Sequence, residues 1–385
     1  MSNLVTARLS EKNIGIVFGC FAPCHLGHFN TIMQAKREND ACIVVVCGQP
    51  GDRGEAVGLD LRRRFRYMRE LFAEDEKVVV TELDETGMPL YPNGWTEWLE
   101  AVQSIVKATM VSSAEKLTWY VGEKEYITEL EVRTNDFIRF INRQELPISA
   151  TLIRENPYKY WRYIMLPFRR VFSMNILVLG TASGGKSTLV KDLGRYFDSP
   201  YTDEYARRYE EKYNVRDEEL AINDFNYMGA GQFENNKNAI ISPMNKGLMF
   251  ADTDVLVTKV YTKYYCSPQE YAQLAPSFDL LIAQQQWEII FVIPPITPYV
   301  NDDFRDMSYA DETSRWHLHQ LFMAELEAHQ LLEKVVMLDQ KGNLETDSQG
   351  FYARYEAAKK MFRTMCIINQ VFGLIKGKQN EEEQR

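Results

Sequence analysis

A nine-residue segment near the middle of the chain, Gly180-Thr-Ala-Ser-Gly-Gly-Lys-Ser-Thr188, constrains the fold more than any other stretch. It follows an apolar run at 175–179 that predicts a buried strand, and it precedes a segment at 189–193 that predicts a helix. This is the strand–loop–helix context in which the pattern G-x-x-x-x-G-K-[ST] binds phosphate. Backbone N–H groups of such a loop point at a polyphosphate, and the helix N-terminus adds partial positive charge. A glycine-rich connecting turn is the alternative, but the flanking segments favour a nucleotide site.

The loop also contains the side chains that a nucleoside triphosphate site needs. Lys186 is expected to reach the β- and γ-phosphates of ATP, and Ser187 is expected to hold Mg²⁺. The other loop residues expected to bind ATP are Gly180, Gly185 and Thr188. We therefore predict an ATP- and Mg²⁺-using P-loop domain with a parallel sheet, spanning 173–375, followed by a charged tail at 376–385.

Further candidate residues follow two later strands of this half. The apolar run 248–252 ends in Asp252, which favours this carboxylate as the group that orients Mg²⁺, directly or through water. Asp254 is expected to contact the substrate. A polar loop at 294–315 follows the next apolar run, and its Arg305 is the arginine expected to contact the transferred phosphate.

The segment Tyr201-Thr-Asp-Glu-Tyr-Ala-Arg207 lies where small-molecule P-loop kinases place an acidic residue beside the acceptor hydroxyl. Asp203, the favoured catalytic residue, or Glu204 is expected to accept a ribose hydrogen bond or to act as a base. Glu204 and Tyr205 are assigned to the substrate site. The alternative is that Asp203 only caps a helix.

The N-terminal half carries a second and more specific motif. After an apolar run at 14–18, which predicts a strand, comes Gly19-Cys-Phe-Ala-Pro-Cys-His-Leu-Gly-His28, which matches G-x-F-x-P-x-H-x-G-H. Two histidines three residues apart at a loop-to-helix junction can face one point in space. A lone histidine is more often a packed core residue, but the full match favours His25 and His28 as site residues.

This motif resembles that of the nucleotidylyltransferase superfamily, whose two imidazoles bind the triphosphate of ATP while an acceptor phosphate attacks the α-phosphate. The resemblance implies that His25 and His28 are catalytic and that Gly19 and Phe21 belong to the ATP site. The second motif of the superfamily is I-S-x-T-x-x-R, and this chain has Ile148-Ser-Ala-Thr-Leu-Ile-Arg154. The ATP-binding residues that this motif implies are Ser149, Thr151 and Arg154.

Strand and helix patterns alternate between the two motifs. Expected strands lie at 41–47, 78–81, 118–121 and 137–141. This alternation predicts a doubly wound, Rossmann-like parallel sheet over 1–172. Relatives that use a pyridine nucleotide stack an aromatic ring on the nicotinamide, which points to Trp95 as a substrate residue; a core tryptophan is an equally weighted alternative.

The composition limits the kinds of partner and the cellular location that we expect. A formal net charge of −10 over 385 residues argues against nucleic acid as a partner. No apolar run reaches the length of a membrane span, so we expect no membrane insertion. Six scattered cysteines without a C-x-x-C pair favour reduced thiols and a cytoplasmic location.

A nucleotidylyltransferase followed by a small-molecule P-loop kinase resembles the NadR-type enzymes, which are bifunctional nicotinamide-nucleotide adenylyltransferases and ribosylnicotinamide kinases. The resemblance implies that the C-terminal domain phosphorylates nicotinamide riboside to the mononucleotide, NMN. The N-terminal domain then transfers AMP from ATP to NMN, giving NAD⁺ and pyrophosphate. The implied ligands are nicotinamide riboside, NMN, ATP and NAD⁺, and assembly into a homo-oligomer is left open.

Three departures from this family accompany the match. Only about a dozen residues precede the first expected strand, too few for the helix-turn-helix repressor domain of some members. Cys20 stands where relatives place Lys, and Ala182 stands where relatives often place Glu. Two other hypotheses stay open: that one domain alone is active, with the riboside kinase favoured, and that the chain is a nucleotide-binding sensor.

Overall fold

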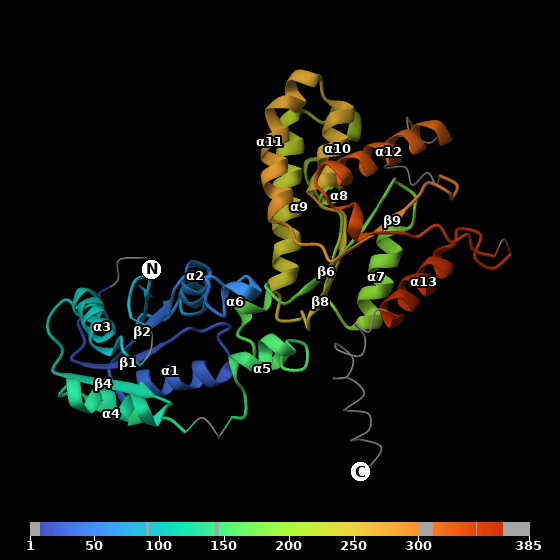
Figure 1. Ribbon diagram of the computed structural model, residues 1–385. Helices are drawn as coiled ribbons and strands as arrows, with labels where there is room; N and C mark the ends of the chain where they lie inside the picture. Colours follow the sequence, from blue (N-terminus) through green and yellow to red (C-terminus); the bar gives the residue numbers. More distant parts are fainter. Residues whose placement is uncertain (1–7, 90–91, 143–145, 300–310, 344, 365–385) are drawn as a thin grey trace, which may run out of the picture. The chain divides into compact units, whose positions relative to one another are not determined.

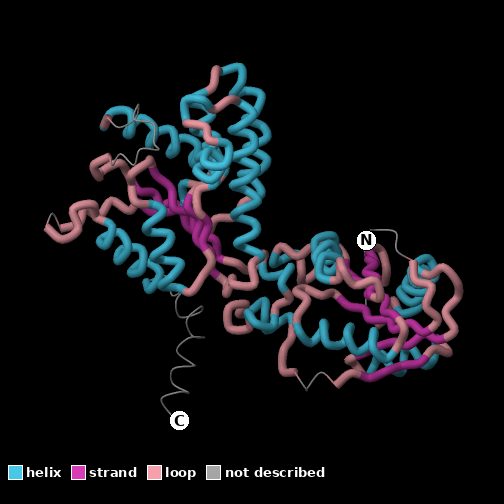
Figure 2. Tube along the Cα trace, turned by 180° about the vertical axis from the view of Figure 1, so that it is seen from behind, coloured by secondary structure: helices cyan, strands magenta, loops and turns pink. Residues whose placement is uncertain are grey.

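The computed structural model describes residues 8–89, 92–142, 146–299, 311–343 and 345–364 (Figure 1). The chain forms two compact units, Met1–Phe172 and Ser173–Arg385, which we describe separately. In each unit strands lie between helices, as the tube drawing shows in magenta and cyan (Figure 2).

The first unit is built on a parallel five-stranded sheet with the strand order β3-β2-β1-β4-β5. The strands are β1 (Asn13–Gly19), β2 (Ala41–Gly48), β3 (Val78–Asp84), β4 (Lys116–Val121) and β5 (Phe137–Phe140). The helices are α1 (Leu26–Glu38), α2 (Leu61–Leu71), α3 (Trp95–Thr109), α4 (Lys124–Arg133), α5 (Ala150–Glu155) and α6 (Leu166–Arg169). The chain order reverses between β1 and β4, where doubly wound sheets bind ligands.

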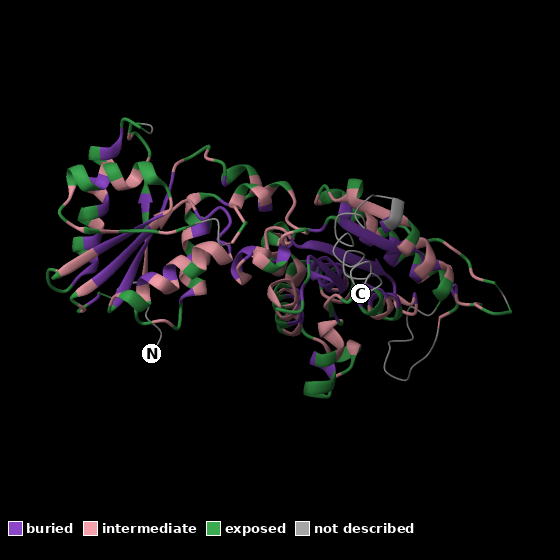
Figure 3. Ribbon diagram, turned by 90° about the horizontal axis from the view of Figure 1, so that it is seen from below, coloured by how far each residue is buried: buried purple, intermediate pink, exposed green. Residues whose placement is uncertain are grey.

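Both faces of this sheet are buried, which explains why its central strands are apolar without interruption. Every residue of β2 is buried. Alternate side chains of β1 and β2 serve opposite faces: Val17 and Val44 pack with α1, α2, α5 and α6, whereas Ile16 and Ile43 pack with α3 and α4. Figure 3 shows the strands as buried and the outer faces of the helices as exposed.

The second unit also has a parallel five-stranded sheet, with the order β10-β9-β6-β8-β7. The strands are β6 (Met174–Gly180), β7 (Tyr201–Thr202), β8 (Leu248–Asp252), β9 (Ile289–Ile293) and β10 (Val335–Met337). The helices are α7 (Lys186–Phe197), α8 (Tyr205–Tyr213), α9 (Ile222–Ile241), α10 (Val255–Tyr265), α11 (Pro268–Gln284), α12 (Glu312–Ala328) and α13 (Phe351–Thr364), and a 3₁₀ turn, η4, spans Asp217–Glu219.

The two faces of this sheet are covered unequally. Helices α8 to α12 form one large core with Leu177, Met249 and Ile290. On the other face α7 and α13 close the sheet, and the ring of Phe362 lies 5.2 Å from that of Phe197 and 5.8 Å from that of Phe291. Strand β8 ends at Asp252, and α10 begins three residues later at Val255.

The predicted class, two α/β units with parallel sheets, is confirmed. Strand β7 was missed, because a two-residue strand carries no periodic signal. Helix α13 begins at Phe351 and is described to Thr364, and the predicted charged tail at 376–385 lies outside the described residues. No described helix is long and apolar enough to cross a membrane.

Candidate active sites

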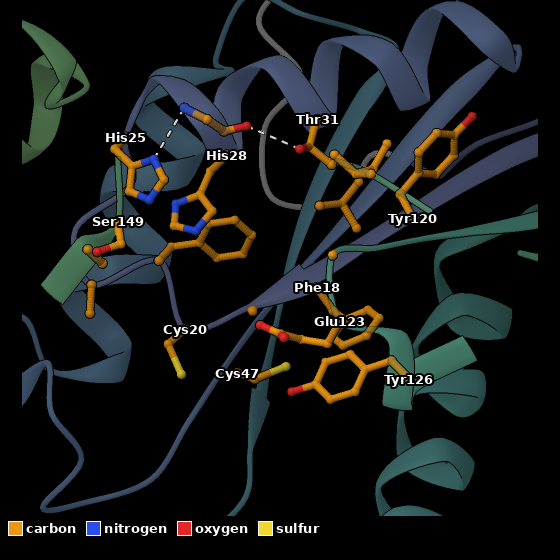
Figure 4. A pocket seen from close by; sticks show the side chains of 18 of the residues that line it. Phe18, Cys20, His25, His28, Thr31, Cys47, Tyr120, Glu123, Tyr126 and Ser149 are labelled. Atoms are coloured by element: carbon orange, nitrogen blue, oxygen red, sulfur yellow. Dashed lines mark hydrogen bonds between the residues drawn. The ribbon is translucent and has the colours of Figure 1, made fainter. Parts of the chain in front are cut away.

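The first site is a pocket of about 670 Å³ at the carboxyl end of β1, with the two motif histidines on one wall (Figure 4). His25 caps α1, and its Nδ1 accepts a hydrogen bond from the Gly27 N–H at 3.2 Å. The rings of His25 and His28 are stacked with centroids 3.8 Å apart, and Phe21 lies edge-on to His28 at 5.0 Å. The helix start therefore places both imidazoles side by side at the pocket, together with the positive end of α1.

The second motif docks on the first motif. Ser149 caps α5 by accepting a hydrogen bond from the Leu152 N–H at 3.2 Å. Arg154 donates from Nη1 to the Ala22 carbonyl at 2.6 Å and from Nη2 to Thr151 Oγ1 at 3.0 Å. Burial, with the nearby positive charge of Arg53, lowers the pKa of Arg154. Segments about 130 residues apart thus place an arginine, a serine and a threonine on the wall of the histidine pocket.

The far side of the pocket is aromatic. The ring of Trp95 lies 5.1 Å from that of Tyr126 and 5.6 Å from that of Trp98, and all three line the pocket. Trp95 is only 7% exposed, so it is at once a packed residue and a wall of the site. Tyr126 and Glu123, which follow the end of β4, also face this space (Figure 4).

The second site is the P-loop of the second unit. Gly185 precedes α7 with a φ of +81°, a left-handed conformation that favours glycine. Lys186 Nζ donates to the Thr181 carbonyl at 3.2 Å and so folds back over the loop. Ser187 and Thr188 begin the exposed side of α7.

Asp252 ends β8 beside this loop and is 1% exposed. Its Oδ1 has no hydrogen-bond partner among the described residues. Burial raises the pKa of Asp252 to about 6, while Lys186 acts in the opposite direction and Ser187 hydrogen-bonds the carboxylate. A buried carboxylate oxygen without a donor, next to a serine hydroxyl, is an arrangement that a bound cation would satisfy.

A smaller pocket, of about 110 Å³, reaches the P-loop at Ala182. Glu204 lines it, whereas Asp203 is half exposed and pairs with Lys191 at 3.1 Å. Tyr205 turns away: its N–H donates to Gln232 Oε1 at 2.7 Å, and its ring packs against Gly231. Of the three predicted site residues in this segment, Glu204 is therefore the one that lines the pocket, and Ala206 and Arg207 of the same segment line it as well.

Asp254, expected at the substrate, has a different environment. It is fully buried and caps α10, with Oδ1 accepting from the Leu256 N–H at 3.0 Å and Oδ2 from Trp287 Nε1 at 3.0 Å. Both oxygens are used inside the unit, which favours a structural role over the expected substrate contact. Arg305 lies outside the described residues.

The sequence pattern missed another arginine near the P-loop. Arg315, in α12, is 5% exposed and donates from Nη1 to the Thr297 carbonyl at 2.6 Å. Thr297 Oγ1 donates to the Ser183 carbonyl in the P-loop at 3.4 Å. Nε and Nη2 of Arg315 have no hydrogen-bond partner within the described part of the chain. The one sequence signal for a role of Arg315 is its position at the end of the polar loop 294–315.

Comparison with known proteins agrees with this architecture. Residues 16–156 match a cytidylyltransferase-like family and residues 175–346 match an AAA-domain family. The trifunctional NAD biosynthesis/regulator protein NadR of Salmonella typhimurium is 29% identical over 77% of this chain and 72% of its own length; the Escherichia coli protein is 27% identical over the same shares. A crystal structure of a NadR protein in complex with NR is 40% identical, with a TM-score of 0.82, covering 93% of this chain and 97% of that one. Another, with NAD and AMP-PNP, is 39% identical with a TM-score of 0.80 over the same shares.

The two sheets, the paired histidines and the P-loop define an ATP-using enzyme with a nucleotidylyltransferase unit followed by a P-loop kinase unit. The sequence identity to the solved NadR structures extends over nearly their whole length and identifies the family of this chain. It belongs to the NadR family, and the resemblance to that family in the sequence is confirmed.

Proposed function

We propose that this protein makes NAD⁺ from nicotinamide riboside in two ATP-dependent steps, one in each unit. The second unit phosphorylates the 5′-hydroxyl of the riboside, giving NMN and ADP. The first unit transfers AMP from a second ATP to NMN, giving NAD⁺ and pyrophosphate. The observation that supports this most is that both phosphate-binding motifs are fully assembled, each beside a pocket for an acceptor.

In the adenylyl step a phosphate oxygen of NMN attacks the α-phosphorus of ATP, and the bond to pyrophosphate breaks. No group of the protein needs to become covalently bonded. The side-by-side rings of His25 and His28 would donate N–H groups to the triphosphate, where negative charge accumulates. Arg154 would add a fixed positive charge on the same wall, held in place by Ala22 and Thr151.

The aromatic side of the same pocket suits the nicotinamide ring. The phosphates would lie at the wall formed by His25 and His28. The ring of NMN would therefore extend toward Trp95 and Tyr126 on the other side of the pocket. A pyridinium ring is cationic, and the face of a tryptophan attracts cations as well as flat rings. We assign the nicotinamide subsite to Trp95, and Gly19 and Phe21 to the ATP side.

In the kinase step the 5′-hydroxyl attacks the γ-phosphorus, and the bond to ADP breaks. Lys186 and the backbone of 180–188 would hold the β- and γ-phosphates. Glu204 lines the acceptor pocket, so we propose that Glu204 accepts the proton of the attacking hydroxyl. Asp203 pairs with Lys191 and has no part in this step. The two uncommitted donors of Arg315 are available for the transferred phosphoryl group, a role expected of Arg305.

The residues around Asp252 fit Mg²⁺. Its Oδ1 is buried and has no hydrogen-bond partner among the described residues, and Ser187 lies against the carboxylate. Ser187 and Asp252 would hold the ion, which when bound neutralises charge on the β- and γ-phosphates. Asp252 would meet it as a carboxylate, because a cation opposes the effect of burial on the pKa of this group.

Chromatography of reaction products tests the proposal directly. Purified protein would receive ATP and Mg²⁺ with either nicotinamide riboside or NMN. We expect NAD⁺ from both starting compounds, with NMN as the intermediate from the riboside. NMN that accumulates without conversion would show that only the kinase works. No conversion of either compound would contradict the proposed function.

A further inference from the structure

The start of helix α13 lies against the P-loop of the second unit. Figure 1 shows α13 beside α7, the helix that follows the P-loop. The ring of Phe351, the first residue of α13, is so close to Gly185 that a Cβ atom at Gly185 would lie only 2.5 Å from Cε1 of the ring. Arg354 follows one turn later, with its guanidinium 5.6 Å from the centre of the same ring. A helix far from the P-loop in the sequence therefore forms part of its support.

Arg354 is buried, and its hydrogen bonds go to backbone carbonyl groups. The residue is 1% exposed. Its Nη2 donates to the carbonyl of Gln349 at 2.7 Å and to that of Gly184 at 3.3 Å, and its Nη1 donates to the carbonyl of Gln340 at 3.4 Å. The bond to Gly184 joins α13 directly to the P-loop across 170 positions of sequence.

The positive charge of Arg354 is only partly compensated within the unit. Burial lowers the pKa of Arg354, and the charge of Asp347 acts in the opposite direction. Among the residues that the structure describes, Arg354 forms no salt bridge with a carboxylate. Because a buried ion is costly unless an opposite charge compensates it, this guanidinium favours the presence of an anion nearby.

The peptide between Gly184 and Gly185 connects the guanidinium with the inner side of the P-loop. This peptide is trans, so the carbonyl of Gly184 and the N–H of Gly185 point in opposite directions. The carbonyl faces Arg354, and the N–H therefore points away from it, as the N–H groups of a P-loop do when they face phosphates. A hydrogen bond from a cation to the carbonyl polarises the peptide and makes its N–H a stronger donor.

We propose that Arg354 is a positioning residue of the kinase unit: from behind the P-loop it fixes the Gly184–Gly185 peptide and strengthens the Gly185 N–H as a donor to the β-phosphate of ATP. Resting on the proposed kinase activity, this assigns the start of α13 to the nucleotide site, although it carries no nucleotide-binding motif. Phe351 supports the same peptide from the side of Gly185. Arg354 acts through the peptide and touches neither substrate.

The test measures riboside phosphorylation by the full chain with variants of Arg354. Arg354→Met keeps the length and the apolar packing of the side chain but removes its charge and its donors. We expect KM for ATP and the inhibition constant of ADP to rise about tenfold, the size of one hydrogen bond to a charged group, while KM for the riboside stays within about twofold. Arg354→Lys retains the charge, so both constants should rise only about threefold.

A matched control removes a positive charge from the same helix at a position away from the P-loop. Lys359 pairs with Glu356 at 2.6 Å and lies 4.7 Å from the centre of the Tyr196 ring. Lys359→Met should leave KM for ATP unchanged. Adenylyl transfer by the first unit and the melting temperature would show that each variant is folded. If Arg354→Met does not fold, the comparison of Arg354→Lys with Lys359→Met decides, because only the first should raise KM for ATP.

The outcomes separate this inference from the proposed function. If Arg354 only packs α13, Arg354→Met should lower the melting temperature with an unchanged KM for ATP, and this result would overturn the role of Arg354. A rise of the same size in KM for the riboside would also overturn it, because the effect would then be a general disturbance of the unit.

Failure to phosphorylate any riboside would contradict the proposed function but would still leave Arg354 open to test. Calorimetric titration with ADP would then measure the P-loop as the binding component that Lys186→Ala abolishes. This component should be about tenfold weaker in Arg354→Met than in the unmodified protein. Equal affinity in the two proteins would overturn the role of Arg354.

Discussion

Under the proposed function the two nucleotide sites of this chain bind the same ligand, a triphosphate, by different means. In the first unit side chains would make most of the contacts: His25, His28 and Arg154 line a pocket of about 670 Å³. In the second unit the backbone of the P-loop and the N-terminus of α7 would make them, with one lysine and a buried carboxylate beside a pocket of about 110 Å³.

This difference follows from the phosphate that each unit must activate. Attack at the α-phosphate requires room for two nucleotides, one on each side of the reacting atom. Attack at the γ-phosphate requires only a small acceptor beside the end of the triphosphate. The two sites should therefore fail independently and respond differently to pH and to substrate structure.

The largest expected effect comes from removing one group from each site. His28→Ala should lower the rate of adenylyl transfer by about a hundred- to a thousandfold, because it removes a donor to developing charge. Riboside phosphorylation should stay within about twofold of the unmodified protein, since the other unit holds that site. Lys186→Ala should give the reverse pattern, measured by the same product assay. Loss of both activities in either variant would show that the sites depend on each other.

Arg154 tests whether the docking of the second motif on the first matters. Arg154→Ala should lower kcat/KM for adenylyl transfer by about a hundredfold, because it removes a charge and the hydrogen bonds to Ala22 and Thr151. Arg154→Lys keeps the charge but cannot make both hydrogen bonds. Its kcat/KM for adenylyl transfer should therefore lie between the values of Arg154→Ala and of the unmodified protein. A lysine variant with full activity would reduce the role of Arg154 to its charge alone.

Asp252 should make the kinase site more sensitive to acid than the adenylyl site. Its pKa is raised to about 6 by burial, so below this pH the ligand-free protein holds a neutral carboxyl group that binds Mg²⁺ poorly. We expect the Mg²⁺ concentration for half-maximal kinase rate to rise about tenfold per pH unit below 6. A flat Mg²⁺ requirement from pH 7 to 5 would contradict this.

The same shift predicts an effect on stability. The pKa of Asp252 in the folded protein lies above its usual value of 3.8. The stability that this group contributes to the folded state is therefore fully present below pH 3.8 and is lost as the pH rises through 6. Asp252→Asn should therefore raise the melting temperature of the ligand-free protein at pH 8, by a few degrees, while it lowers kinase activity. Scanning calorimetry at pH 5 and pH 8 measures the difference, which should be smaller at pH 5.

Trp95 gives the smallest effect and decides between two roles. If its ring contacts nicotinamide, Trp95→Leu should raise KM for NMN by about tenfold and leave riboside phosphorylation unchanged. If it serves only the packing against Trp98 and Tyr126, the variant should lose thermal stability with an unchanged KM.

The features that could be predicted from the sequence are those formed by short continuous segments. The P-loop and the G-x-F-x-P-x-H-x-G-H segment each fit in about ten residues, and in both the strand before and the helix after are long enough to read from their periodicity. Parallel sheets packed with helices were predicted for both units from the alternation of strands with helices, but the order of the strands was not.

Other features depend on contacts between distant segments. Glu210 and Asp217 look like ordinary solvated acids in the sequence, and only the fold of η4 against α8 brings them to one pocket. Arg315 became a candidate because α12 buries it beside Thr297. Asp254 shows the opposite case: in the sequence an acid two residues after Asp252 resembles a site residue, and in the fold the cap of α10 and Trp287 use both its oxygens.

The most direct test of two independent active sites is to mix two inactivated proteins. His28→Ala alone should convert nicotinamide riboside to NMN and stop, and Lys186→Ala alone should leave the riboside untouched. A mixture of the two with ATP and Mg²⁺ should produce NAD⁺ from the riboside, because NMN made by one molecule can be used by the other. If the mixture accumulates NMN or leaves the riboside unchanged, while the unmodified protein makes NAD⁺, the account of two self-sufficient sites is wrong.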